Sequence, residues 1–217
     1  MRNLFGQQLA QLNHDMTRMG ALCEEAIAVA TKFLLDGDME RKERVTALEA
    51  EIDKMERDIE HLCMRLLLKQ QPVARDLRQI SAALKMITDM ERIGDQALDI
   101  VDIVPYLGGK TVDECEDIRK MAEATIKMVV ESVDAYVKGD LNLARSVIQC
   151  DQIVDEYFAS VKKSLIAMIA DQRVDGEYAL DLLMIAKYFE RIGDHATNIA
   201  EWVEFSVTGV HEESEDQ

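Results

Sequence analysis

Two parts of this 217-residue sequence repeat one another, which restricts the fold to an architecture built twice. The segment Glu-Arg-Ile-Gly-Asp at 91–95 recurs letter for letter 99 residues later, at 190–194. A Gly-Asp pair at 37–38 recurs 102 residues later, at 139–140. The difference between the two offsets places a short deletion between these positions of the repeat, in a loop that tolerates changes in length. We therefore expect two copies of one structural unit in tandem.

Apolar residues recur at three- and four-residue spacing along almost the whole chain, a pattern typical of amphipathic α-helices. Only two prolines and ten glycines interrupt the pattern, and aromatic residues make up only 5% of the chain. A β-sandwich or barrel would need many turns and β-branched strands. The interruptions predict six helices, the fourth opening on a capping box at 111–114. The helices are expected to end near residues 36, 70, 105, 138, 171 and 207.

The predicted fold class is all-α, with six long helices forming two tandem, pseudo-symmetric three-helix bundles. We expect the first bundle to comprise residues 1–108 and the second residues 109–208. The segment 209–217 ends in an acidic stretch without an apolar face, and we expect it to be a disordered tail.

The charge and the cysteines exclude several classes of protein. Lys and Arg number 25 against 42 Asp and Glu, a net charge of −17, which argues against nucleic-acid binding because phosphate contacts need basic side chains. The four cysteines show no short spacing, so a zinc ribbon or a disulfide framework is not expected. We expect no signal peptide, because the first eight residues turn polar at once, and no membrane span, because no apolar run comes near the ~20 residues that cross a bilayer. We expect a cytoplasmic protein that meets a membrane only through partner proteins.

Four pairs of acidic residues at four-residue spacing occupy matching positions in the two repeats. One such pair alone means little, because 42 acids in 217 positions give roughly eight pairs by chance. The four-residue spacing places both carboxylates of a pair on one helix face. The four pairs are Glu49 and Asp53, Glu91 and Asp95, Asp151 and Asp155, and Glu190 and Asp194.

The lengths of the hairpin arms predict that these pairs meet. The midpoint between the two pairs of the first repeat is Pro72, and that of the second repeat falls at 172–173, both in predicted turns. Two antiparallel helices with arms of about 20 residues bring the acids to one height, about 30 Å from the turn. Carboxylates that close repel one another unless a cation neutralises them or water separates them. Exposed acids that face water or pair with neighbouring Arg and Lys remain the alternative.

Oxygen ligands without Cys or His favour Mg²⁺, Mn²⁺, Ca²⁺ or iron over a structural zinc site. A ferritin-like di-iron centre is not expected, because the single Asp58-x-x-His61 motif has no second copy. His195 is expected to be a hydrogen-bonded or packing residue. Gly94 and Gly193 in mid-helix each cost about 1 kcal/mol relative to Ala, which close helix approach or room for a metal would explain.

Three features together are typical of one known family. They are the segment Gln-Gln-Pro-Val-Ala-Arg-Asp-Leu-Arg at 70–78, both Glu-Arg-Ile-Gly-Asp segments, and the duplicated three-helix layout. From residue 2 to about 207 the chain resembles the PhoU family of phosphate-transport accessory and regulatory proteins. The resemblance implies two three-helix bundles per chain, usually in a homodimer, and multinuclear metal clusters on Glu/Asp-x-x-x-Asp motifs. The ligands it implies here are Glu49, Asp53, Glu91, Asp95, Asp99, Asp151, Asp155, Glu190, Asp194 and Asn198.

Asn198 keeps an asparagine that the family pattern often carries, whereas Asp99 departs from it, so the two clusters are expected to differ in charge and metal preference. The cofactor implied is a divalent or polynuclear metal, whose identity stays open among iron, manganese, magnesium and zinc.

The resemblance also implies a function. Such proteins negatively regulate phosphate-specific ABC transport and phosphate-starvation two-component signalling, through the transporter ATPase subunit and a phosphate-sensing histidine kinase. We expect no enzyme activity. The alternative is a polynuclear carboxylate metallohydrolase acting on phosphate esters, although the sequence offers no general base apart from the ligands. The basic tip of the first hairpin is either a docking surface or ordinary solvated charge; it comprises Arg65, Lys69, Arg75 and Arg78.

Overall fold

The computed structural model describes residues 2–70, 72, 74–108 and 116–210, and this part of the chain is helical without a strand. The predicted all-α fold with six long helices is confirmed. The capping box at 111–114 and the tail from 211 onward lie outside the described residues. The helices are α1 (Arg2–Asp36), α2 (Met39–Gln70), α3 (Ala74–Ile103), α4 (Glu116–Lys138), α5 (Leu141–Ala170) and α6 (Gly176–Thr208), with a 3₁₀ turn η1 (Val104–Leu107).

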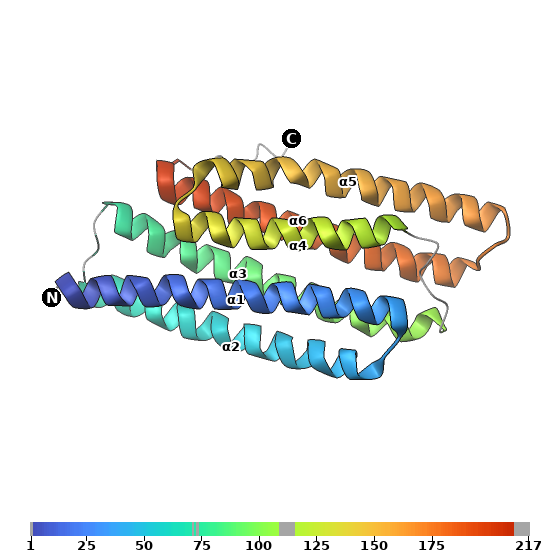
Figure 1. The fold of residues 1–217 in the computed structure, drawn as a ribbon, viewed down its shortest axis with the longest axis horizontal. Helices are drawn as coiled ribbons and strands as arrows, with labels where there is room; N and C mark the ends of the chain where they lie inside the picture. The colour runs from blue at the N-terminus through green and yellow to red at the C-terminus, as the bar shows by residue number, and fades with distance from the viewer. Residues whose placement is uncertain (1, 71, 73, 109–115, 211–217) are drawn as a thin grey trace.

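The helices form two three-helix bundles that lie side by side along their length (Figure 1). Helices α1, α2 and α3 pack on one another in the first bundle, and α4, α5 and α6 do so in the second. The bundles meet through α3 against α6 and through α1 against α4. The tandem arrangement is therefore confirmed, whereas the boundary at 108–109 stays a prediction.

The repeated Gly-Asp pair ends one helix and starts the next in both bundles. Gly37 and Gly139 adopt the left-handed conformation, with φ of 68° and 64°, which glycine reaches without steric cost. The Asp38 carboxylate accepts a hydrogen bond from the Glu40 amide at 3.2 Å. The Asp140 carboxylate accepts bonds from two amides at the start of α5. The shared motif is therefore a helix stop followed by an N-terminal cap.

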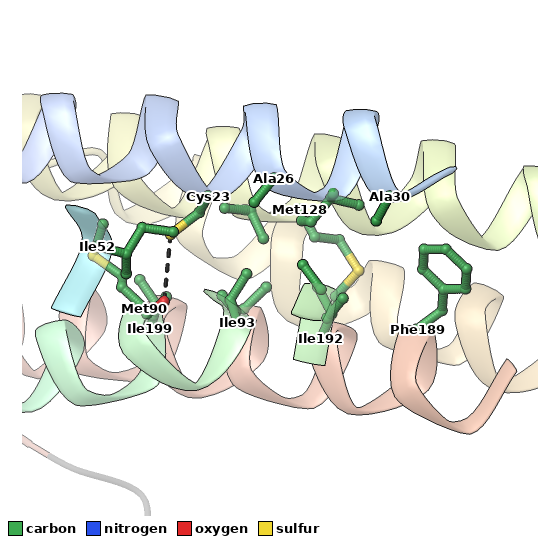
Figure 2. Packing of buried hydrophobic residues seen from close by; sticks show 14 of the residues in the cluster. Cys23, Ala26, Ala30, Ile52, Met90, Ile93, Met128, Phe189, Ile192 and Ile199 are labelled. Atoms are coloured by element: carbon green, nitrogen blue, oxygen red, sulfur yellow. Dashed lines mark hydrogen bonds between the residues drawn. The ribbon is translucent and has the colours of Figure 1, made fainter. Parts of the chain in front are cut away.

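One apolar core runs through both bundles and crosses the line where they meet (Figure 2). Ile93 and its counterpart in the second repeat, Ile192, are both fully buried in it. The buried Cys23 thiol donates a hydrogen bond to the carbonyl of Met90 at 3.3 Å. Burial raises the pKa of the Cys23 thiol to about 12, so this sulfur stays protonated and unreactive. The shared core makes the two bundles one packing unit.

Two glycines allow helices to approach closely. A Cβ on Gly94 would lie 3.1 Å from Cδ1 of Ile52, so α3 packs tightly on α2 there. A Cβ on Gly20 would lie 3.0 Å from Cγ2 of Val133, so α1 comes equally near α4 across the two bundles. Close helix approach therefore explains Gly94. None of the helices within the described ranges combines the length and the apolarity required to span a bilayer.

Candidate metal centre

The first acid cluster, which we define as Glu49, Asp53, Glu91 and Asp95, lies along the contact between α2 and α3. Ile52, which precedes Asp53, is fully buried. Gly94, which precedes Asp95, is also buried and packs against Ile52. Because the neighbouring residue faces the core, each acid falls at the edge of the helix contact, where it is half-buried. The two pairs of the first hairpin therefore lie beside each other, as their equal distances from the turn predict.

The acids of the first cluster repel one another across the two helices. Burial raises the pKa of Glu49, and the carboxylates of Asp53 and Asp95 raise it further. Burial likewise raises the pKa of Glu91, with Asp95 adding to the shift and Arg92 opposing it. Carboxylates on each helix thus raise the pKa of acids on the opposite helix, and a cation bound between the helices would relieve this repulsion.

Two arginines contact three of these four acids. Arg57 Nη1 lies 3.1 Å from Oδ2 of Asp53, one turn earlier on α2. Arg92 Nη1 lies 3.1 Å from Oδ2 of Asp95, and its Nε lies 3.4 Å from Oε2 of Glu91. Both arginine side chains are more than half exposed, so these pairs are individually weak.

The second acid cluster comprises Asp151, Asp155, Glu190 and Asp194, on α5 and α6. Burial, then the charges of Asp155 and Glu190, raise the pKa of Asp151. Partial burial and the carboxylates of Glu190 and Asp151 raise the pKa of Asp194 to about 6, although this residue is still exposed at the surface. The one basic contact described within this cluster joins Lys187 Nζ to Glu190 Oε2. The four acids of the second hairpin therefore also lie within electrostatic reach of one another.

Gly193 lies on α6 beside the second cluster. A Cβ at this position would lie 3.5 Å from Oδ1 of Asp151 and 3.4 Å from Cγ1 of Val154. Both distances are ordinary van der Waals contacts, so the Asp151 carboxylate lies against α6 and a methyl group at position 193 would fit beside it. Packing therefore does not require glycine at position 193, and room for a metal beside the carboxylates stays a prediction.

Asp99 and Asn198 occupy matching positions but have different partners. Burial and the neighbouring charge of Asp95 raise the pKa of Asp99, so this residue extends the first cluster by a turn, while Arg191 on α6 opposes the shift. Asn198 instead donates a hydrogen bond to the Asp89 carboxylate on α3 at 3.1 Å. The structure therefore joins Asn198 to the opposite bundle as well as placing it on the acidic helix face.

Two neighbours of the site escaped the sequence analysis. Asp89 contacts His195 Nδ1 at 2.9 Å across the contact between α3 and α6, and no local spacing signals a contact between bundles. Burial raises the pKa of Glu56, and the charge of the nearby Asp53 raises it further. Glu56 follows Glu49 by two helical turns, so a longer search along the acidic stripe would have found it.

The donor set fits a hard cation, because carboxylate oxygens that raise one another's pKa gain most from a positive ion between them. Within the described ranges, no group of three or more His, Cys, Asp or Glu side chains is already arranged to hold a metal ion. The ten predicted ligands are thus brought into two acidic surfaces, and their role in binding metal stays a prediction.

The basic hairpin tip is only partly free for docking. Arg78 Nε donates a hydrogen bond to the carbonyl of Ser206 at 3.4 Å, and its side chain packs near Gly209 at the end of α6. Arg78 therefore belongs to the fold, whereas Arg65 and Arg75 are exposed. The side chain of Lys69 lies outside the described part of the structure.

An open surface groove of about 610 Å³ lies between α1 and α2 and includes the Asp58 and His61 side chains. None of the residues that line this groove belongs to either acid cluster. The lining residues are Gln11, Asp15, Asp58, His61, Leu62, Met64, Arg65 and Leu68.

Comparison with known proteins gives a consistent result. The PhoU domain matches residues 16–104 and 118–203, one match for each repeat. The chain is 33% identical to the phosphate-specific transport system accessory protein PhoU homolog of Clostridium acetobutylicum over 96% of both chains. It is 36% identical to the protein of the same description from Synechocystis, over 97% of this chain and 94% of the relative.

Solved structures show the same likeness. The crystal structure of PhoU from Pseudomonas aeruginosa superposes with a TM-score of 0.88 at 34% identity and covers 95% of this chain and 100% of that one. The phosphate transport system regulatory protein PhoU from Streptococcus pneumoniae also gives a TM-score of 0.88, at 26% identity, over 96% of this chain and 99% of that one.

Proposed function

Because the chain belongs to the PhoU family, we propose that it is an accessory protein of phosphate-specific transport that acts by binding other proteins rather than by catalysis. In this role it restrains phosphate uptake by the ABC transporter and keeps phosphate-starvation signalling silent while phosphate is plentiful. Its direct partners are the transporter ATPase subunit and a phosphate-sensing histidine kinase. It acts in the cytoplasm as a homodimer.

The observation that carries this proposal is the match of both repeats, over nearly the full chain, to relatives described as accessory proteins of that transport system. Two properties of the chain agree with it. Two long helical bundles that share one core present extended helix faces to partners. A net charge of −17 favours basic protein surfaces and cations over phosphate-rich polymers.

The second part of the proposal is that the acid clusters bind metal cations. Glu49, Asp53, Glu91, Asp95 and Asp99 would hold metal in the first repeat, and Asp151, Asp155, Glu190, Asp194 and Asn198 in the second. Iron, manganese, magnesium and zinc are the candidates. A bound cation would neutralise the repulsion within each hairpin and join its two helices. These residues position and neutralise charge, and the proposal requires no reaction from them.

A deletion strain tests the regulatory role. We expect loss of the gene to raise alkaline phosphatase expression in phosphate-rich medium, because the signalling kinase is no longer restrained. The wild-type gene on a plasmid should restore repression. Normal repression in the deletion strain, with the loss of the protein verified by immunoblot, would overturn the proposed function.

The exposed arginines of the first hairpin tip provide a test of docking. The variant Arg65→Glu/Arg75→Glu should reduce co-purification of the transporter ATPase severalfold, because it reverses the charge of two exposed side chains at the hairpin tip. Arg119→Glu, an exposed arginine on α4, serves as the control for reversed charge elsewhere. Equal recovery of the ATPase with all three proteins would remove the hairpin tip from the docking surface.

A further inference from the structure

The two acid clusters differ in the basic side chains that surround them, although their acids match position by position. In the first cluster, guanidinium groups contact Asp53, Glu91 and Asp95. Asp53, Glu91 and Asp95 are the groups that a cation between α2 and α3 would need. A divalent ion binding there must displace these guanidinium groups or bind beside them.

The second repeat lacks the counterpart of Arg57. The residue 102 positions after Arg57 is Ala159, which is exposed on α5 one turn after Asp155, as Arg57 is one turn after Asp53. Among the described residues, the position on α5 that corresponds to Arg57 therefore offers no guanidinium to pair with Asp155.

The counterpart of Arg92 is present in the second repeat but is turned to other partners. Arg191, 99 positions after Arg92, lies over the ring of Tyr188 at 5.9 Å and opposes the raised pKa of Asp99 in the first repeat. Its charge therefore acts on a carboxylate of the other bundle. Among the described residues, Lys187 is the basic side chain that pairs with the second cluster, through Glu190, and its charge also opposes the raised pKa of Asp194.

We propose that Arg57 and Arg92 compete with metal cations for the carboxylates of the first acid cluster, and that the second cluster is free of the competitor that Arg57 provides. This inference rests on the metal binding proposed above. The pairs involve exposed arginine side chains, so a divalent ion can displace them. A displaced guanidinium that stays nearby still repels the ion, and its removal should strengthen binding about tenfold.

The first experiment measures Mn²⁺ binding to the full chain by the loss of the electron paramagnetic resonance signal of free Mn²⁺. Glu190→Gln/Asp194→Asn is the background, so that the signal reports the first cluster. Adding Arg57→Gln/Arg92→Gln should raise the Mn²⁺ affinity about tenfold at low salt. The matched control is Arg18→Gln/Arg44→Gln, which removes the same charge from arginines paired with Glu51 and Glu25 outside the cluster. The control should change the affinity by less than about twofold.

The second experiment transfers the competitor. On a Glu91→Gln/Asp95→Asn background, Ala159→Arg should weaken Mn²⁺ binding at the second cluster about tenfold, because it places a guanidinium one turn from Asp155. Ala159→Gln controls for side-chain size at this exposed helical position, where either residue is compatible with folding.

The outcomes separate this inference from the function proposed above. Mn²⁺ binding that the arginine substitutions leave unchanged, or that the control pair strengthens equally, would overturn the competition and leave metal binding intact. Absence of Mn²⁺ binding from the wild type and from every variant would overturn both the competition and the proposed metal binding. Circular dichroism of each variant verifies that the helices have formed.

Discussion

Asp194 is the residue whose titration reports most directly on the acid clusters. Its pKa in the folded protein is raised to about 6 from an ordinary value of 3.8, by partial burial and by the charges of Glu190 and Asp151. The folded chain therefore holds this proton more tightly than the unfolded chain does. The resulting stabilisation is complete below about pH 4 and is lost as the pH rises through about 6.

We predict that Asp194→Asn makes stability less dependent on pH. The wild type should lose stability between about pH 4 and 6 in the presence of a chelator, and the variant should lose less, because the neutral amide has no proton to release. Thermal unfolding followed by circular dichroism measures this slope. Glu123→Gln, at an exposed position on α4, should keep the wild-type slope. Equal slopes for wild type and Asp194→Asn would show that Asp194 is not repelled by its neighbours.

At the scale of elements, the contact between α1 and α4 depends on Gly20. A Cβ at this position would meet three atoms of Val133 at 3.0 to 3.3 Å, and a β-branched side chain has little freedom to move away. The closeness of the helices therefore requires a residue without a side chain at that point.

Gly20→Ala should lower the free energy of unfolding by about 1–3 kcal/mol, because the added methyl overpacks the contact between the bundles. Gly6→Ala is the control, since Gly6 is exposed on the same helix with nothing within 4 Å of its Cβ. That change should be neutral or stabilise by up to about 1 kcal/mol through helix propensity. Urea unfolding measures both variants, and an unchanged or greater stability for Gly20→Ala would contradict the close packing.

The helices and their hairpins could be predicted from sequence, because helical periodicity, glycine turns and caps are local signals. The convergence of Glu49 with Asp95 also followed, since two regular helices with equal arms leave no other relative height. The pairing of Arg57 with Asp53 has the four-residue spacing of a helical ion pair, so it could also be predicted from the sequence. The interaction of Arg191 with Asp99 could not be predicted in this way, because it depends on packing between the bundles.

At the scale of the whole molecule, the mutual placement of the two bundles was beyond local reasoning. The contact of Asp89 with His195 joins positions 106 residues apart on different bundles, and no periodicity encodes it. The repeat predicts two similar bundles but not how they face each other. Pseudo-symmetry also conceals differences, since Asp99 and Asn198 occupy matching positions and have unlike partners.

The central claim is that each hairpin brings four carboxylates together to bind cations. Equilibrium dialysis against Mn²⁺ with elemental analysis tests it on the wild type, on Glu91→Gln/Asp95→Asn and on Glu190→Gln/Asp194→Asn. We predict that each double variant loses the metal bound by its own hairpin. The quadruple variant that combines all four substitutions should bind none. A metal content that stays at the wild-type value in the combined variant would contradict the claim.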